Sequence, residues 1–390
     1  MTVGCDVMLT RSAPLRIALC LVACLLSQPR AEPARASVWT VPMPGRGSPV
    51  ADAASVYFVA DTHTVVAVAV DTGVVRWQRP MGPVSGRAFG RRLTLAGDLV
   101  LVGDDDLVAL DRRDGSVRWA FRPPGGEGVG LYLGDVDSDL VFCGSASGRA
   151  YAVDWRTGRM RWSHIVADDG RTTVFSPRVH GDSVAAGYTR FTAPNGGGIV
   201  YLDPATGARR WRYEFPPVAS PVPIGVGSAG GPVLSGRRIV AADSSGRITA
   251  VDRETGERAW ELPPLRASGL AWAQASSMDY RSLAVVGSTL VASSLSGAVV
   301  GIGMDTRRER WRFWDERLGA AGFAVATGRD GVWIPFMGGV VQLDPATGRE
   351  MQRLGDTSRK NAWPPLEIAN WVYDSAPRGL TAYFLKGAQQ

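Results

Sequence analysis

The chain has 390 residues, of which 45% are hydrophobic, 21% charged and 8% aromatic. This balance is typical of a globular protein with a sizeable core, and it excludes a disordered or fibrous chain. The formal net charge is +6, but the arginines alternate with Asp and Glu and form no run of five. Nucleic-acid binding needs a local concentration of basic side chains, so we expect no nucleic-acid partner.

Residues 1–36 have the order of a secretory signal peptide. Arg11 and Arg16 precede an apolar stretch from Ile17 to Leu26, and a polar segment then leads to small residues before Ser37. These parts correspond to an n-region, an h-region and a cleavage site. About ten apolar residues cover about 15 Å of helix, half of the hydrocarbon core, which favours export over a membrane span.

A lipid anchor is the alternative to simple secretion. Leu21-Val22-Ala23-Cys24 resembles the bacterial lipobox, in which the cysteine is lipidated and becomes the new N-terminus. Leu25 and Leu26 follow Cys24 where polar residues are usual, so we favour cleavage after Ala36. The protein is predicted to be secreted or to lie in the cell envelope, with membrane contact only through such an anchor.

The cysteines and histidines predict neither a disulfide framework nor a metal centre. Removal of the signal segment leaves Cys143 as the one remaining cysteine. The three histidines are scattered and have no Cys or carboxylate at metal-ligand spacing. Asp104-Asp105-Asp106 is a weak calcium candidate, because calcium ligands usually alternate or come from several loops. We interpret these carboxylates as solvated turn charges and expect no metal.

From residue 37 on, the pattern apolar-x-Asp-x-x-Thr-Gly-x-x-x-Trp recurs at intervals of 41 to 51 residues. It predicts a strand that ends at Asp, a tight turn whose Gly takes positive φ, and a second strand that begins near Trp. Repetition in every copy favours turn-capping by the Asp side chains over catalysis. The residues predicted to be structural are Trp39, Trp77, Trp119, Trp162, Trp211, Trp260, Trp311, Asp111, Asp154, Asp203, Asp252, Asp344, Gly73, Gly115, Gly158, Gly207, Gly256 and Gly348.

The repeat predicts an all-β fold. Each copy is preceded by another short strand and an apolar segment, which makes four antiparallel strands per unit, as in a β-propeller blade. Val38–Val41 lacks the preceding strands, and Trp371–Tyr373 with Leu380–Leu385 lacks a following Trp strand. These two halves are predicted to pair as an eighth blade and close the ring, which leaves no free edge at that point. A ring of seven blades is the alternative.

Ala250-Val251-Asp252, continuing through Thr255-Gly256 to Trp260, resembles the repeat of the PQQ-like (quinoprotein-type) β-propellers, over essentially all of residues 37–390. The resemblance implies eight blades. The family contains calcium-dependent quinoprotein dehydrogenases and non-catalytic propellers, among them the lipoprotein of the outer-membrane β-barrel assembly machine. The dehydrogenases carry two adjacent cysteines, whereas Cys143 is followed by Gly144. No catalytic residue carries over and no cofactor is expected, with PQQ and calcium as the alternative.

Three neighbouring repeats are longer than the others, with Trp intervals of 49, 49 and 51 residues. The extra residues fall in Tyr188–Gly198, Arg212–Gly230 and Glu261–Arg281, whose loops should share the face opposite the Thr-Gly turns. Rigid scaffolds carry recognition residues on such loops, so we predict a site for a protein partner or small ligand. The alternative is that the aromatic residues pack within their own loops. The candidate residues are Arg190, Phe191, Asn195, Trp272, Gln274, Asp279, Tyr280 and Arg281.

The sequence therefore predicts an exported, non-catalytic propeller that acts as a binding or scaffolding module in the cell envelope or the extracellular space. A PQQ- and calcium-dependent dehydrogenase is the alternative from another class. A ligand-sensing or glycan-sensing ectodomain is a third hypothesis that the residues do not exclude.

Overall fold

The described residues form β-strands joined by turns and short connections. The structure is a computed structural model that describes residues 37–60, 63–82, 92–124, 130–191, 196–216, 231–243, 245–264, 280–294, 297–319, 325–355 and 365–385, all within the unit Ala34–Gln390. The predicted export segment, including Cys24, lies outside these residues. Within them there is no helix, and so none that is long and apolar enough to cross a membrane.

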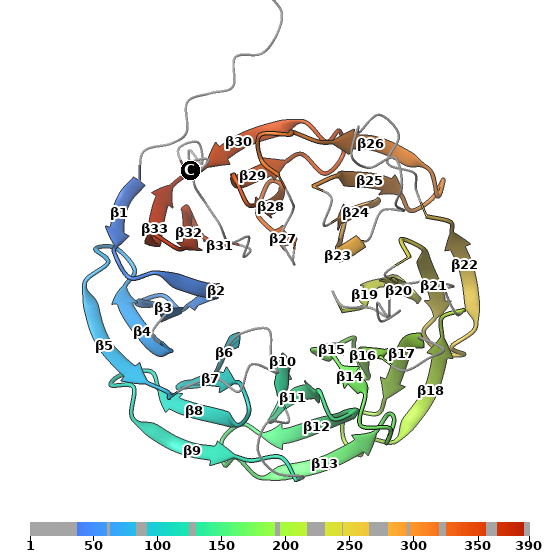
Figure 1. Ribbon diagram of the computed structural model, residues 1–390, viewed down its shortest axis with the longest axis horizontal. Helices are drawn as coiled ribbons and strands as arrows, with labels where there is room; N and C mark the ends of the chain where they lie inside the picture. The colour runs from blue at the N-terminus through green and yellow to red at the C-terminus, as the bar shows by residue number, and fades with distance from the viewer. Residues whose placement is uncertain are drawn as a thin grey trace, which may run out of the picture. The chain divides into compact units, whose positions relative to one another are not determined.

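Eight antiparallel sheets stand around a common axis as the blades of a propeller (Figure 1). Strands follow one another in chain order within a blade, because a tight turn joins each to the next. The first three blades contain β2 (Gly45–Ala51), β3 (Ser55–Ala60), β4 (Thr64–Ala69) and β5 (Val75–Pro80); β6 (Arg92–Ala96), β7 (Leu99–Gly103), β8 (Leu107–Asp111) and β9 (Val117–Phe121); and β10 (Leu131–Asp137), β11 (Leu140–Ser145), β12 (Arg149–Asp154) and β13 (Met160–Ile165).

The next four blades continue the same order from the axis outward. The fourth contains β14 (Thr172–Val174), β15 (Arg178–Val179), β16 (Val184–Arg190), β17 (Gly196–Leu202) and β18 (Arg209–Glu214). The fifth to seventh contain β19 (Val233–Ser235), β20 (Arg238–Ala242), β21 (Ile248–Asp252) and β22 (Arg258–Leu262); β23 (Tyr280–Val286), β24 (Thr289–Ser294), β25 (Val299–Gly303) and β26 (Glu309–Phe313); and β27 (Ala326–Thr327), β28 (Val332–Phe336), β29 (Gly339–Leu343) and β30 (Glu350–Leu354).

The eighth blade joins the two ends of the ring. Its strands are β31 (Leu366–Ile368), β32 (Trp371–Ala376), β33 (Gly379–Phe384) and, outermost, β1 (Ser37–Val41). Trp39 lies opposite Ala382 in the antiparallel pair of β1 with β33, and the ring of Trp39 lies 5.8 Å from that of Tyr373. The predictions of an all-β fold, of eight blades and of closure by the N-terminal strand are confirmed.

The inner strand of the fourth blade is interrupted. Both β14 and β15 pair with β16, and the chain between them contains Pro177, which has no N–H to give to a sheet. The Pro177 carbonyl instead accepts the N–H of Asp135 from the third blade, at 3.0 Å. A Cβ on Gly134 would lie 2.2 Å from this oxygen, so the glycine permits the two blades to approach closely near the axis.

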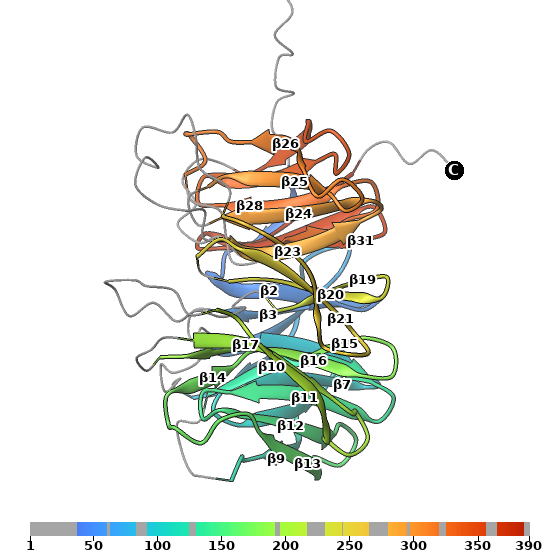
Figure 2. The same ribbon diagram turned by 90° about the vertical axis from the view of Figure 1, so that its right-hand side faces the viewer.

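The core lies between neighbouring blades, which stack face to face around the ring (Figure 2). Between the first and second blades, Tyr57 and Trp77 pack with Val100 and Leu110. Between the third and fourth, Phe142 and Trp162 pack with Tyr188. Strands buried on both faces explain why the middle strands of each blade are almost continuously apolar.

A glycine in the turn between the third and fourth strands of a blade receives the Trp of the preceding blade. Gly207 has φ of 71°, and a Cβ there would lie 2.5 Å from the Trp162 ring, so a side chain at Gly207 would strain the backbone and clash with the indole. The equivalent pairs are Gly73 with Trp39, Gly115 with Trp77, Gly158 with Trp119, Gly256 with Trp211 and Gly348 with Trp311.

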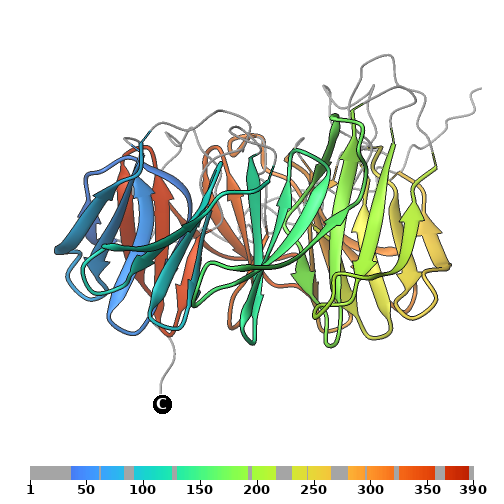
Figure 3. The same ribbon diagram turned by 90° about the horizontal axis from the view of Figure 1, so that it is seen from below.

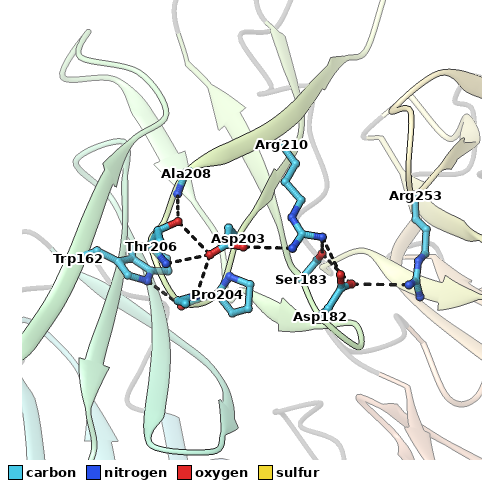
Figure 4. A network of polar contacts seen from close by, with 10 residues as sticks. Trp162, Asp182, Ser183, Asp203, Pro204, Thr206, Ala208, Arg210 and Arg253 are labelled. Carbon is cyan, nitrogen blue, oxygen red and sulfur yellow. Dashed lines mark hydrogen bonds and ion pairs between the residues drawn. The ribbon is translucent and has the colours of Figure 1, made fainter.

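The Asp of the repeat shapes the same turn. Asp203 Oδ1 accepts the N–H of Ala205 at 3.1 Å and that of Thr206 at 2.9 Å, and Trp162 Nε1 donates to the Pro204 carbonyl at 2.8 Å (Figure 4). The carboxylate therefore holds the carbonyl that follows it towards the indole of the preceding blade. The same combination joins Asp111 with Trp77, Asp154 with Trp119, Asp252 with Trp211, and Asp344 with Trp311.

Two turns lack the Asp. Ala69 and Gly303 occupy its position, because their carbonyls accept the turn N–H that the Asp carbonyl accepts elsewhere. The facing indoles are those of Trp39 and Trp260, whose Nε1 atoms are buried without a hydrogen-bond partner in the described part of the structure. In the turn that faces Trp260, Arg307 stands where the other turns have Gly, and its φ is 56°. The turn therefore keeps its left-handed backbone conformation without a hydrogen bond from the indole.

Candidate functional site

The three long connections leave the ring on one face. They follow β16, β18 and β22, and they comprise residues 191–195, 215–232 and 263–279. The strands run from one face to the other, as the edge-on view shows, so the strand ends from which these connections start lie on the face opposite the Thr-Gly turns (Figure 3). The predicted loop Tyr188–Gly198 is wrong in extent, because both of its ends are strand and Tyr188 pairs with Gly198.

We call the face that carries these connections, over the fourth to sixth blades, the long-loop face. Of the predicted binding residues, Asn195, Trp272, Gln274 and Asp279 lie outside the described residues. Tyr280 and Arg281 begin β23, and only their backbone is described. The structure therefore leaves the grouping of these six residues as a prediction, and it describes the side chains of Arg190 and Phe191.

Arg190 ends β16 and forms two loose ion pairs. Its Nε lies 3.4 Å from Asp169 Oδ2, and its Nη2 lies 3.9 Å from Glu214 Oε1. Neither contact has the short distance of a charge-assisted hydrogen bond, and partly exposed pairs of this kind contribute little to stability. Arg190 therefore keeps guanidinium donors that a binding partner can use.

Asp169 is held in its charged form by its own loop. Burial alone would raise its pKa, but the N–H of Arg171 and the Thr172 hydroxyl, with Arg190 nearby, lower the pKa below the usual value. Its Oδ2 accepts the Thr172 hydroxyl at 2.9 Å. The carboxylate is thus a fixed negative charge beside the loosely paired Arg190 side chain, and the two give this part of the face both signs of charge.

Arg212, which the sequence reasoning missed, fixes the strand ends beneath Arg190. Its guanidinium lies 4.7 Å from the centre of the Tyr188 ring, and its Nε donates to the Tyr188 hydroxyl at 2.8 Å. Its other nitrogens contact the Val166 carbonyl at 2.9 Å and Glu214 at 2.7 Å. The only sequence signal is an arginine directly after the repeat Trp, and it carries no information about Tyr188.

Apolar side chains are exposed next to these charges. Phe191 is 46% exposed at the end of β16, and Ile165 is 48% exposed at the end of β13 on the neighbouring blade. The Phe191 N–H donates to the Arg171 carbonyl at 2.9 Å, so the backbone below its ring is fixed. An exposed aromatic ring beside loosely paired charges is the mixture found at protein interfaces.

The opposite face carries a polar network that ties blades to one another. Arg210 donates to Asp203 at 3.1 Å and to Asp182 at 2.9 Å, and Asp182 lies 3.7 Å from Arg253 of the next blade (Figure 4). Hydrogen bonds from Arg210 lower the pKa of Asp182. Each of these charged side chains is paired with another one in the network, so we assign the network to holding the blades together and not to binding a ligand.

The described residues do not fit the PQQ and calcium alternative. Cys143 is fully buried in the core between the second and third blades, where burial raises its pKa to about 12, and the chain has no second cysteine beside it. Within the described ranges no group of three His, Cys, Asp or Glu side chains is placed to hold a metal ion. We therefore derive no chemical step through that cofactor.

The comparisons with known proteins agree with this architecture. The family model of the outer membrane protein assembly factor BamB matches residues 31–190 and 104–354, which together cover most of the chain. The chain belongs to the BamB family. The PQQ-like repeat resemblance seen in the sequence is thereby confirmed. No curated protein matches the chain in sequence.

Solved structures of different function share the fold. BamB from Moraxella catarrhalis is 19% identical, with 92% of this chain and 99% of that chain covered and a TM-score of 0.61. Quinohemoprotein alcohol dehydrogenase from Comamonas testosteroni is 14% identical, with 91% and 77% covered and a TM-score of 0.67. The computationally designed Ika8 protein is 15% identical, with 90% and 98% covered and a TM-score of 0.68. At such identities the likeness establishes the fold alone.

Proposed function

We propose that the protein is an exported, non-catalytic propeller that binds a protein partner in the cell envelope through its long-loop face. The observation that carries this proposal is the exposed Phe191 ring beside the loosely paired Arg190, on strand ends that Arg212 holds in place. Membership of the BamB family supports it, because that family is described as an assembly factor for outer membrane proteins.

The chemistry of the site indicates the kind of partner surface. Phe191 supplies apolar area that an apolar or aromatic side chain can cover, and Arg190 supplies donors to a carboxylate. Asp169 beside them disfavours an acidic surface that is charged throughout. The partner is therefore an amphipathic protein segment with an apolar anchor and a nearby acidic residue.

The decisive experiment is site-specific photo-crosslinking in the native host. A photoreactive phenylalanine analogue replaces Phe191, and in a matched strain it replaces Val117, which is 43% exposed on the opposite face. We expect one envelope protein to be crosslinked from position 191 and not from position 117. Adding Arg190→Glu should abolish that adduct while the thermal midpoint stays unchanged. Equal adducts from both positions, or an adduct indifferent to Arg190→Glu, would contradict the assigned face.

Export and the absence of catalysis are tested separately. Mass spectrometry of the mature protein should find a free Ser37, or lipid on Cys24 if the anchored form is made, and an intact residue 1 would contradict export. Supplying PQQ and calcium and scanning alcohols and sugars with an electron-acceptor dye should give no turnover. Dye reduction that depends on PQQ would overturn the non-catalytic part of the proposal and favour the dehydrogenase.

A further inference from the structure

An arginine on the axial wall has no carboxylate partner. Arg92 begins β6, the inner strand of the second blade, and its Nη1 donates to the Ser176 hydroxyl of the fourth blade at 3.1 Å. The side chain therefore spans the inner strand of the third blade, where Tyr132 lies beside it. No Asp or Glu in the described part of the chain forms an ion pair with Arg92.

A second arginine stands next to the first. Arg178 is in β15, and its Nη1 lies 3.4 Å from Asp135 Oδ1, while Asp135 Oδ2 accepts the Val179 N–H at 3.0 Å. Asp135 thus orients Arg178 and neutralises one positive charge of the two. With two guanidinium groups and one carboxylate, the cluster of Arg92, Arg178 and Asp135 has a formal net charge of about +1.

Arg92 is exposed to solvent, so a ligand can reach its guanidinium. Desolvation by the neighbouring protein lowers its pKa, and the charge of Arg178 lowers it further, so the two arginines lie within electrostatic range of each other. Tyr132 and Phe175, whose rings meet edge to face at 5.3 Å, belong to the third and fourth blades beside them. Partial desolvation of a guanidinium strengthens its interaction with an anion.

We propose that Arg92 and Arg178, the axial arginine pair, bind a ligand that carries carboxylate or phosphate groups. Ser176 uses one of the Arg92 donors and leaves the others of the planar fork for bidentate contact with such a group. Bringing two cations together is unfavourable in the free protein, and a bound anion relieves that repulsion. The proposal is independent of the partner-binding face, because the pair lies on the axial wall and not on the long connections.

The test is isothermal titration of the full chain with two probes, citrate and inorganic phosphate, at constant chloride and low ionic strength. We expect saturable binding of at least one probe at one site per chain. Arg92→Gln and Arg178→Gln should each weaken it about tenfold or more, because each removes a charged fork. Tighter citrate binding assigns the site to carboxylates, and tighter phosphate binding assigns it to phosphates.

A charge-matched control separates a site from a general effect of charge. Arg159→Gln removes an exposed arginine from a Thr-Gly turn on the outer part of the third blade, and we expect it to leave the affinity unchanged. Ser176→Ala removes the hydroxyl that orients Arg92 and keeps the charge of Arg92, so it should weaken binding several-fold; it serves if Arg92→Gln fails to fold. No saturable binding of either probe, or an equal loss in Arg159→Gln, would overturn the proposal.

Discussion

The turn without an Asp in the sixth blade offers a gain-of-stability test. Gly303 occupies the Asp position, and the facing Trp260 Nε1 is buried without a partner. A Cβ on Gly303 would lie 2.5 Å from Thr306 Oγ1 and from Arg310 Nε, both at the ends of flexible side chains. In the fourth blade the equivalent threonine and arginine are the side chains that bond to Asp203. We predict that Gly303→Asp stabilises the protein.

The magnitude follows from what the carboxylate would add. It gains two turn N–H groups and brings the following carbonyl to the Trp260 indole, each worth roughly 0.5–1.5 kcal/mol net. Replacing Gly also restricts the unfolded chain, by roughly 0.4–1 kcal/mol. Displacing the two side-chain ends offsets part of this, so the net gain is about 1–3 kcal/mol. With roughly 350 folded residues at about 2.1 cal/mol/K each, the thermal midpoint rises by about 1.5–4 °C.

Calorimetry and urea unfolding of three variants measure the gain. Gly303→Ala supplies the Cβ and the chain restriction without the carboxylate, so the difference between the two substitutions isolates the turn bonds. In a Trp260→Phe background the indole part of the gain should disappear. If Gly303→Asp is no more stable than Gly303→Ala, the inference that the carboxylate directs the carbonyl to the indole is wrong.

Two further predictions concern acid sensitivity and ring closure. Burial, with Arg178 nearby, lowers the pKa of His180 to about 4. As the pH falls, the unfolded chain therefore binds the proton before the folded protein does. The contribution of His180 to stability is complete above about pH 6.5 and falls by about 3 kcal/mol towards pH 4. Urea midpoints measured against pH should show that His180→Gln loses this part of the acid dependence, and an identical dependence in the variant would contradict the prediction. Deleting Ser37–Val41 removes the outer partner of β33, which then pairs with β32 alone and has a free edge. We expect a lower midpoint and association of copies in gel filtration, and an unchanged monomer would refute closure by pairing.

Repetition is what made the fold predictable from the sequence. A Trp and a turn Gly that recur at regular spacing report a contact made once per blade, as Gly207 with Trp162 illustrates. The half-blade at Val38–Val41 was equally informative, because an unmatched strand at one end of the chain requires a partner at the other. The Trp, the turn Gly and the unmatched strand could be interpreted because the same local sequence and the same blade geometry recur in successive blades of this chain.

Features that depend on a single contact were not predictable. In the sixth copy the sequence around Asp305 resembles that of the repeat Asp. The turn N–H of Arg307 nevertheless donates to the carbonyl of Gly303, so Gly303 and not Asp305 occupies the Asp position. Gly196 and Gly198 read as loop, although both are in β17, where a Cβ on Gly198 would lie 1.9 Å from the Tyr213 carbonyl. Sequence alone does not show how closely another strand approaches.

Arg92 and Arg178 illustrate the same limit at the candidate axial site. The two residues are far apart in the sequence and belong to different blades, and neither lies in the repeated phrase. Ser176, which accepts the hydrogen bond from Arg92, lies in the break of the inner strand next to Pro177. A functional cluster assembled from the variable inner strands has no periodic signal, whereas the outer strands, which carry the Trp, repeat the same contact around the ring.

The one repeat that lacks a Trp shows what the indole requires. Gln352 takes the Trp position in β30, and its neighbour around the ring is the eighth blade, where β33 and β1 come from opposite ends of the chain. No turn joins those two strands, so no glycine at positive φ and no carbonyl following an Asp is present there to receive an indole. Gln352 bonds instead to Gln342 within its own blade. The Trp is therefore kept where a covalent turn faces it, which makes the indole and the turn of the next blade a single structural unit.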